Sequence, residues 1–261
     1  MAISTLDGYI AATKQKLSIF KQAARTTVAA VPFSLFDIAG SPGAGTLAIG
    51  NTANGLVHTD ATAGYHPINT ITGTGYVTGV AFGNSVAGSV KLYDRLFSAG
   101  AYSFNSNVTL ASQPSYAGRV PGGDYKGLEI WLETVTAFTG SQSIAITYLD
   151  QDGVSSVTGT IATGVAPTIG RMFRVPLAAG DSGVQRIDVV TSSVSTVGTF
   201  NVHVMRPLWR GRIAMINGGE NHDFLRTGMP EIYDTSALFP VFYIDSTTSG
   251  VPELYIQIAQ G

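Results

Sequence analysis

Hydrophobic and polar residues alternate with a period of two over many short segments of the chain. Ile144, Ile146 and Tyr148 alternate with Ala145 and Thr147, and residues 128–133 and 254–258 show the same period. Successive side chains of a β-strand point to opposite faces, so this pattern predicts half-buried strands. Further strands are expected at residues 76–82, 89–97, 154–161, 172–177, 184–190, 200–204 and 239–244.

Turn-forming residues separate these segments. Asp152 and Gly153 stand between two strand-like runs, and Asp-Gly in that position is a strong hairpin signal. We expect Gly153 to have a positive φ there. Asp181 and Gly183 belong to a second turn, Gly180–Gly183, between the runs 172–177 and 184–190. The sequence therefore predicts that Asp152, Gly153, Asp181 and Gly183 form turns.

The first 25 residues have a different period. Apolar residues recur at steps of four and three, which predicts an amphipathic helix over about residues 5–24. Such a helix either packs on its own domain or forms an arm that docks on a neighbouring subunit. We interpret residues 1–25 as a helical docking arm, because basic charge is concentrated there and the sequence beyond it is uncharged and β-rich. The residues of the apolar stripe are Leu6, Ile10, Thr13, Leu17, Phe20 and Ala24, of which we expect Leu6, Ile10, Leu17 and Phe20 to form an interface.

The rest of the chain, residues 26–261, is expected to form one domain. It has no evident linker, and no repeat of fixed period indicates a propeller or a solenoid. Residues 39–75 are mostly turn-formers and predict a long ordered loop, which is usually functional or bound at an interface. Many short strands without alternating helices favour an all-β fold, an antiparallel β-sandwich or jelly roll with an N-terminal amphipathic helix and an extended arm.

The composition is typical of a structural protein that packs against other subunits. Only 12% of the 261 residues are charged, against about 25% in typical domains, and Gly, Ser and Thr make up nearly a third. No basic residue lies between Arg25 and Lys91. Either hydroxyl groups keep a sandwich soluble, or surface is buried in an assembly. On the second interpretation, the low-charge residues 26–90 lie against other subunits.

No catalytic, metal or cofactor site is predicted. Gly180–Gly183 resembles the sequence around the serine of chymotrypsin-like proteases, but Val184 replaces a glycine of that motif and no histidine has the matching context, so we interpret Ser182 as a turn residue. The cluster Glu220–Asp223 is more typical of a solvated loop than of a metal site. Cysteine is absent, and none of the four histidines has metal-ligand spacing: His58, His66, His203 and His222.

Arg206, Trp209 and Arg210, with Arg212, form a basic and aromatic cluster. Such a cluster can bind a nucleic acid or form ion pairs between subunits. The net charge of −2 favours the subunit interface, and we expect no direct contact with nucleic acid. Gly and Pro interrupt the uncharged stretch 38–59, so no membrane contact is expected either.

Several segments resemble virion proteins of tailed bacteriophages. One is the hairpin Ile144–Val154, and others are Val175–Leu177 with Gly180–Val184 and Asp188–Thr191, and Val204–Leu208. The resemblance covers most of the chain in short motifs and identifies a class, jelly-roll-like head auxiliary or decoration proteins. The remaining segments that carry it are Leu35–Phe36, Gly40–Pro42, Asn54–Gly55, Thr227–Pro230, Ser236–Leu238 and Ile258–Gly261.

The resemblance implies a non-enzymatic virion structural protein, in the first instance a capsid-associated decoration or cement protein. It implies major capsid protein and further copies of this chain as partners, with a trimer as the first expectation, and assembly in the host cytoplasm. Two alternatives stay open: a major capsid, neck or tail component, and a glycan- or receptor-binding module that uses Trp131, Trp209 and the eleven tyrosines.

Overall fold

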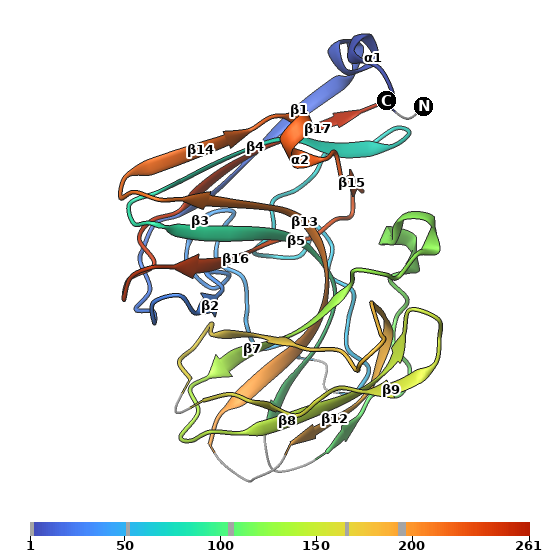
Figure 1. The fold of residues 1–261 in the computed structure, drawn as a ribbon, viewed down its shortest axis with the longest axis vertical. Coiled ribbons are helices and arrows are strands. Elements are labelled where there is room, and N and C mark those ends of the chain that lie inside the picture. The colour runs from blue at the N-terminus through green and yellow to red at the C-terminus, as the bar shows by residue number, and fades with distance from the viewer. Residues whose placement is uncertain (1–2, 51–52, 104–106, 165–166, 193–196) are drawn as a thin grey trace.

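The chain folds almost entirely into antiparallel β-strands, which confirms the predicted fold class. The computed structural model describes residues 3–50, 53–103, 107–164, 167–192 and 197–261. The strands form three sheets, which we call upper, central and lower as they appear in Figure 1. The helices are α1 (Leu6–Ala11) and α2 (Phe224–Thr227), with two 3₁₀ turns at Ala117–Arg119 and Pro121–Gly123.

The upper sheet contains the first and the last strand of the chain. Its inner face packs on the central sheet through a core that includes Leu17, Val80, Phe82 and Ile256. Its strands are, in order, β14 (Gly218–His222), β4 (Gly75–Asn84), β17 (Glu253–Gln260), β1 (Thr13–Lys21) and β3 (Gly40–Ser41), with β15 (Glu231–Ile232) also paired to β4.

The central sheet is built around two long strands, β5 and β13, which bend from the upper sheet down to the lower one (Figure 1). Its first and last strands approach each other, because an isolated bridge joins Phe33 to Arg171 and the Ser34 N–H donates to the Gly170 carbonyl at 2.8 Å. The order of strands is β11 (Met172–Val175), β7 (Glu129–Thr136), β13 (Thr199–Ile213), β5 (Gly88–Ser103), β16 (Leu238–Ile244) and β2 (Pro32–Phe33).

The lower sheet packs on the other half of β5 and β13. Their shared core includes Phe97, Val202, Ile146 and Ile187, all buried. The molecule is therefore two sandwiches that share the central sheet. The strands of the lower sheet are β10 (Ile161–Ala162), β8 (Ser143–Asp150), β12 (Val184–Ser192) and β6 (Val108–Thr109), with β9 (Ser155–Val157) paired to β8.

The expected helix over residues 5–24 is wrong beyond Ala11. Residues 13–21 form β1, in which Leu17, Ile19 and Lys21 are buried and alternate with more exposed neighbours. When apolar residues are sparse, the same positions can fit both a helical and a strand period. Here the segment forms a strand, because it pairs with β17 and buries one alternating face. The side chain of Thr5 caps α1 by accepting from the Gly8 N–H at 3.0 Å.

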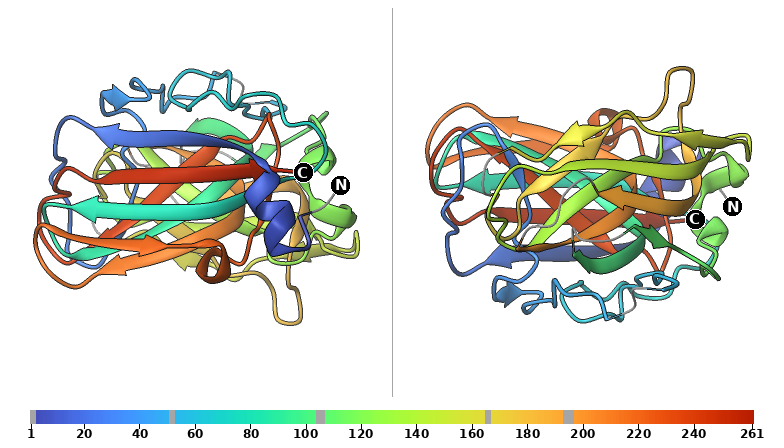
Figure 2. Two further views of the ribbon diagram at one scale, coloured as in Figure 1. Left: turned by 90° about the horizontal axis from the view of Figure 1, so that it is seen from above. Right: turned by 90° about the horizontal axis from the view of Figure 1, so that it is seen from below.

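Part of the low-charge region 26–90 packs in the core of its own domain, so its expected burial against other subunits is wrong for the residues in this core. Val77, Phe82 and Val90 have almost no exposed surface. The described residues between Ser34 and Ile68, which are 34–50 and 53–68, have little regular structure and run along one side of the molecule (Figure 2). Among them, Leu47 and Tyr65 pack against the central sheet.

Candidate functional site

The four predicted interface residues of the N-terminal segment fall into two groups. Leu6 and Ile10 lie on α1 and are 60% and 65% exposed. Leu17 is buried in the upper core and Phe20 is half-buried, both on β1. The structure therefore leaves Leu6 and Ile10 available to a partner and withdraws Leu17 from one.

The structure also divides the basic and aromatic cluster. Arg206 is buried, with Nη2 3.3 Å from Asp94 Oδ2, and Trp209 is buried in the upper core. The Trp209 indole N–H donates to Nδ1 of His222 at 2.8 Å. Arg210, the next residue, is exposed. An aromatic side chain held in this way cannot stack on a base.

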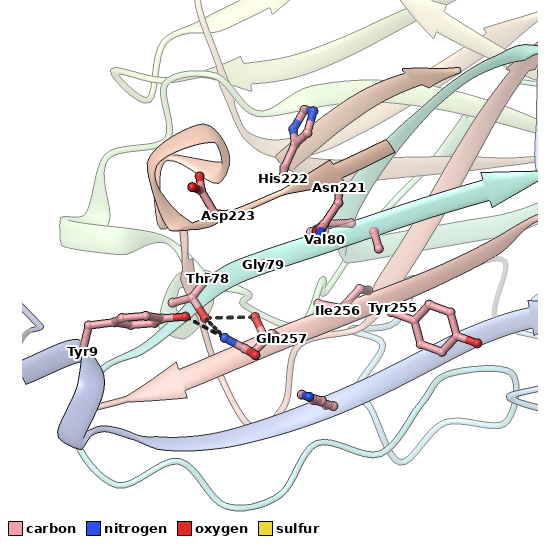
Figure 3. Close-up of a pocket in the computed structure, with 12 residues that line it drawn as sticks. Tyr9, Thr78, Gly79, Val80, Asn221, His222, Asp223, Tyr255, Ile256 and Gln257 are labelled. Atoms are coloured by element: carbon pink, nitrogen blue, oxygen red, sulfur yellow. Dashed lines mark hydrogen bonds between the residues drawn. The ribbon is translucent and has the colours of Figure 1, made fainter. Parts of the chain in front are cut away.

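A groove of about 350 Å³ crosses the outer face of the upper sheet, beside α1 and α2 (Figure 3). Gly79 and Ala81 of β4 line this groove, and the absence of a side chain on Gly79 and the small methyl group of Ala81 leave that part of the sheet open. Tyr255 of β17 stands at one side and is about half exposed. At the other, the Gln257 amide donates to the Tyr9 hydroxyl at 2.7 Å, which fastens α1 to the sheet.

Next to this groove, α1 and α2 form an exposed apolar patch, defined here as Leu6, Ile10 and Leu225. Leu225 is 77% exposed. The two helices meet through the rings of Tyr9 and Phe224, whose centroids are 4.8 Å apart. A cavity of about 390 Å³ opens between them, with Leu6 and Leu225 in its lining. The sequence pattern did not predict Leu225, because α2 is only four residues long and shows no periodicity.

Ser98, His203 and Glu133 have the connectivity of a catalytic triad but lie in the interior. Ser98 Oγ is 2.7 Å from Nδ1 of His203, and Nε2 of His203 is 3.2 Å from Glu133 Oε2. All three side chains are fully buried. Since no substrate reaches a nucleophile without solvent access, this group of residues serves the core rather than catalysis.

The protonation states of this interior group follow from its contacts. Burial lowers the pKa of His203, and the hydrogen bond to Glu133 only partly opposes this. Burial alone would raise the pKa of Glu133, but contacts with His203, Arg95 and Ser34 hold it below its ordinary value. Glu133 is therefore ionised, and a neutral His203 donates to it from Nε2 while Nδ1 accepts from Ser98.

The predicted turn residues lie in two turns of the lower sandwich, one between β8 and β9 and the other before β12, and Gln151 of the first turn is hydrogen-bonded to the second. Gly153 has a φ of 79°, and its N–H donates to the Asp150 carbonyl at 3.2 Å. Asp152 is exposed in the same turn, while Asp181 accepts from the Tyr148 hydroxyl at 2.5 Å. A Cβ on Gly183 would lie 2.0 Å from the Tyr125 carbonyl oxygen, so only glycine fits there.

Ser182 takes part in the second turn through its backbone. Its N–H donates to Oε1 of Gln151 at 2.8 Å. Among the described residues, no group of three or more His, Cys, Asp or Glu side chains is arranged to hold a metal ion. Nor does the described part of the chain contain a helix long and apolar enough to cross a membrane.

Comparisons with known proteins find distant structural similarity alone. No model of a known protein family matches the chain, and no curated protein matches it in sequence. Solved structures that match include the infectious bursal disease virus Gx strain, at 10% identity and a TM-score of 0.23, over 95% of this chain and 80% of that one. The VP2 subviral particle of infectious bursal disease virus matches at 8% identity and a TM-score of 0.22, over 96% and 81% of the two chains.

Proposed function

We propose that this chain is a non-enzymatic structural subunit of a tailed-phage virion, and specifically a decoration or cement protein bound to the capsid. The observation that carries the proposal is the apolar patch of Leu6, Ile10 and Leu225 beside a groove in the outer face of the upper sheet. Exposed apolar side chains gathered at one surface mark a place where another protein binds.

The composition supports the same conclusion. A subunit repeated many times binds by the sum of many contacts, and a charged residue at each contact would cost desolvation energy in every copy. The helix α1 has no buried residue and lies at the start of the chain, outside the sheets. On this proposal α1 is the docking element, and residues from β1 onward are the body that it attaches to the capsid.

The experiment compares two double variants in particles of the phage that encodes the chain. Leu6→Ser with Ile10→Ser should reduce the number of copies per particle by at least about tenfold, by mass measurement or imaging. Val154→Ser with Val157→Ser is the matched control, since these two valines are equally exposed but lie on the lower sandwich. Normal occupancy by the α1 variant, or an equal loss in the control, would contradict the proposed docking role of α1.

A glycan-binding role is the second candidate, and the half-exposed ring of Tyr255 beside the groove favours it. Sugar rings stack on such aromatic faces while amide and carboxylate groups like those of Asn221 and Asp223 bind hydroxyls. Tyr255→Ala should abolish glycan-array binding if this role is correct and should leave particle occupancy unchanged.

A further inference from the structure

A basic cleft lies on the side of the molecule, between the central sheet and the edge of the upper sheet. It has a volume of about 450 Å³, and an adjoining cavity of about 390 Å³ shares three of its basic residues, Lys91, Arg210 and Arg226. With Arg212, four of the 15 basic residues of the chain line this one cleft. The cleft and the apolar patch are lined by different side chains, although Arg226 and Leu225 both lie on α2, and the inference does not depend on the proposed docking role of α1.

The fold brings these four residues together from three elements. Arg210 of β13 is the cross-strand partner of Lys91 on β5, and Arg212 is the partner of Ser89. β7 pairs with β13 only as far as Met205, so among the described strands the last part of β13 is an edge. Arg226 comes from α2, which follows β14. An open edge therefore lies along the cleft.

The acidic residues of the cleft are already engaged. Glu220 accepts from the Arg212 N–H at 2.7 Å and from His222 at 2.5 Å, and Arg226 Nη2 lies 3.6 Å away. Burial would raise the pKa of Glu220, but these donors hold it below its ordinary value, so it is ionised. Arg210 makes no ion pair with any residue that the structure describes. An excess of positive charge therefore faces the cleft.

We infer that the cleft binds an acidic segment of a partner protein, with Arg210, Lys91 and Arg226 receiving its carboxylates. A guanidinium binds a carboxylate with two parallel hydrogen bonds. The cleft has room for a few acidic side chains of a partner. A nucleic acid fits less well. The indole of Trp209 is buried rather than open for stacking on a base.

The experiment uses the full chain and three probes: a tetraglutamate peptide, a tetraglutamine peptide and a short single-stranded oligonucleotide. Trp209 lines one of the two cavities, so tryptophan fluorescence can report binding. We expect saturable binding of tetraglutamate that weakens with added salt, and no binding of tetraglutamine. Arg210→Ala should raise the dissociation constant for tetraglutamate about tenfold, since a charge-assisted hydrogen bond is lost.

Arg186→Ala is the matched control, because Arg186 lies on β12 of the lower sheet with a half-exposed side chain. It should leave the dissociation constant within about twofold. Circular dichroism checks that both variants are folded. Failure to bind tetraglutamate, tighter binding of the oligonucleotide, or an equal effect of Arg186→Ala would each overturn the inference.

Discussion

The carboxylate of Glu133 lies 3.2 Å from Nε2 of His203, and neither side chain has any surface in contact with solvent. Arg95, also buried, lies 3.7 Å from the same carboxylate and stacks over the rings of Phe36 and Phe239. The Ser34 hydroxyl donates to the other carboxylate oxygen. This one acidic side chain therefore balances the charge in a polar interior that links the central sheet to the segment starting at Ser34.

Glu133→Gln should lower the free energy of unfolding by about 3–5 kcal/mol, because it leaves the Arg95 guanidinium buried without an opposite charge. Urea unfolding measures this difference. Glu253→Gln, at the start of β17 near the surface, is the control and should change stability by less than about 0.5 kcal/mol. A loss at position 133 no larger than the control would show that the interior does not depend on this charge.

His58→Phe should make the protein less sensitive to acid. Burial, together with the charge of Arg95 and the nearby His203 and Arg119, lowers the pKa of His58 well below 6.5, and neither ring nitrogen has a hydrogen-bond partner among the described residues. Because the unfolded chain binds this proton at higher pH than the folded chain, stability falls as pH drops below about 6.5. Removing the two unpaired ring nitrogens should also raise the free energy of unfolding by about 1 kcal/mol at pH 7.

Thermal unfolding of both proteins between pH 7.5 and 5 tests this prediction. The wild-type midpoint should fall more steeply than that of the variant over this range. Parallel curves would mean that His58 does not contribute to acid sensitivity; His203, whose pKa is also lowered, accounts for the slope that remains in the variant.

Gly153→Val should lower the free energy of unfolding by about 1–3 kcal/mol, because valine is strained at a φ of 79°. Gly159→Val is the matched control, since Gly159 has no positive φ and its added Cβ would meet no atom within 4 Å. Chemical denaturation of the two variants gives the comparison. Equal effects at both positions would show that the left-handed conformation of Gly153 is not required.

Deleting residues 1–11 should leave the protein folded, while deleting residues 1–25 should unfold it. The short deletion removes α1, which has no buried residue, but the longer one also removes β1 with Leu17 and Ile19 from the upper core. We expect the melting midpoint to fall by only a few degrees for the first variant. Cooperative unfolding of the 1–25 deletion at the wild-type temperature would show that β1 is dispensable.

If the chain serves in a virion as proposed, Ser182→Ala should leave folding and particle yield unchanged, because Ser182 is engaged through its backbone N–H rather than as a nucleophile. Infectivity and yield of particles carrying the variant measure this. Normal assembly with a large loss of infectivity would reveal a chemical role for the hydroxyl.

The strands could be predicted where buried and exposed residues alternate along the chain, because one face of the strand packs on a core. Residues 144–148 and 254–258 have this simple pattern, and β8 and β17 contain them. The prediction was wrong for residues 13–21, because Leu17 and Phe20 fit a helical spacing. The strands that pair with β1, which are β17 and β3, are distant from it in the sequence. Local periodicity carries no information about which strands will pair.

The polar interior could not be predicted either. Ser98, Glu133 and His203 are each unremarkable members of strands, and only the pairing of β5 and β7 with β13 brings them together. The cluster of Arg206, Trp209 and Arg210 shows the opposite case. Its residues were found in the sequence, but β13 buries Arg206 and Trp209 and leaves only Arg210 exposed.

The long strands β5 and β13 have a mechanical consequence. Each is a single continuous strand that extends from one sandwich into the other, so neither strand offers a hinge between the two halves. A load applied at α1 passes through β1 and the upper core to β5 and β13, and along these two strands to the lower sheet. The two sandwiches should therefore unfold together under force, in one cooperative step.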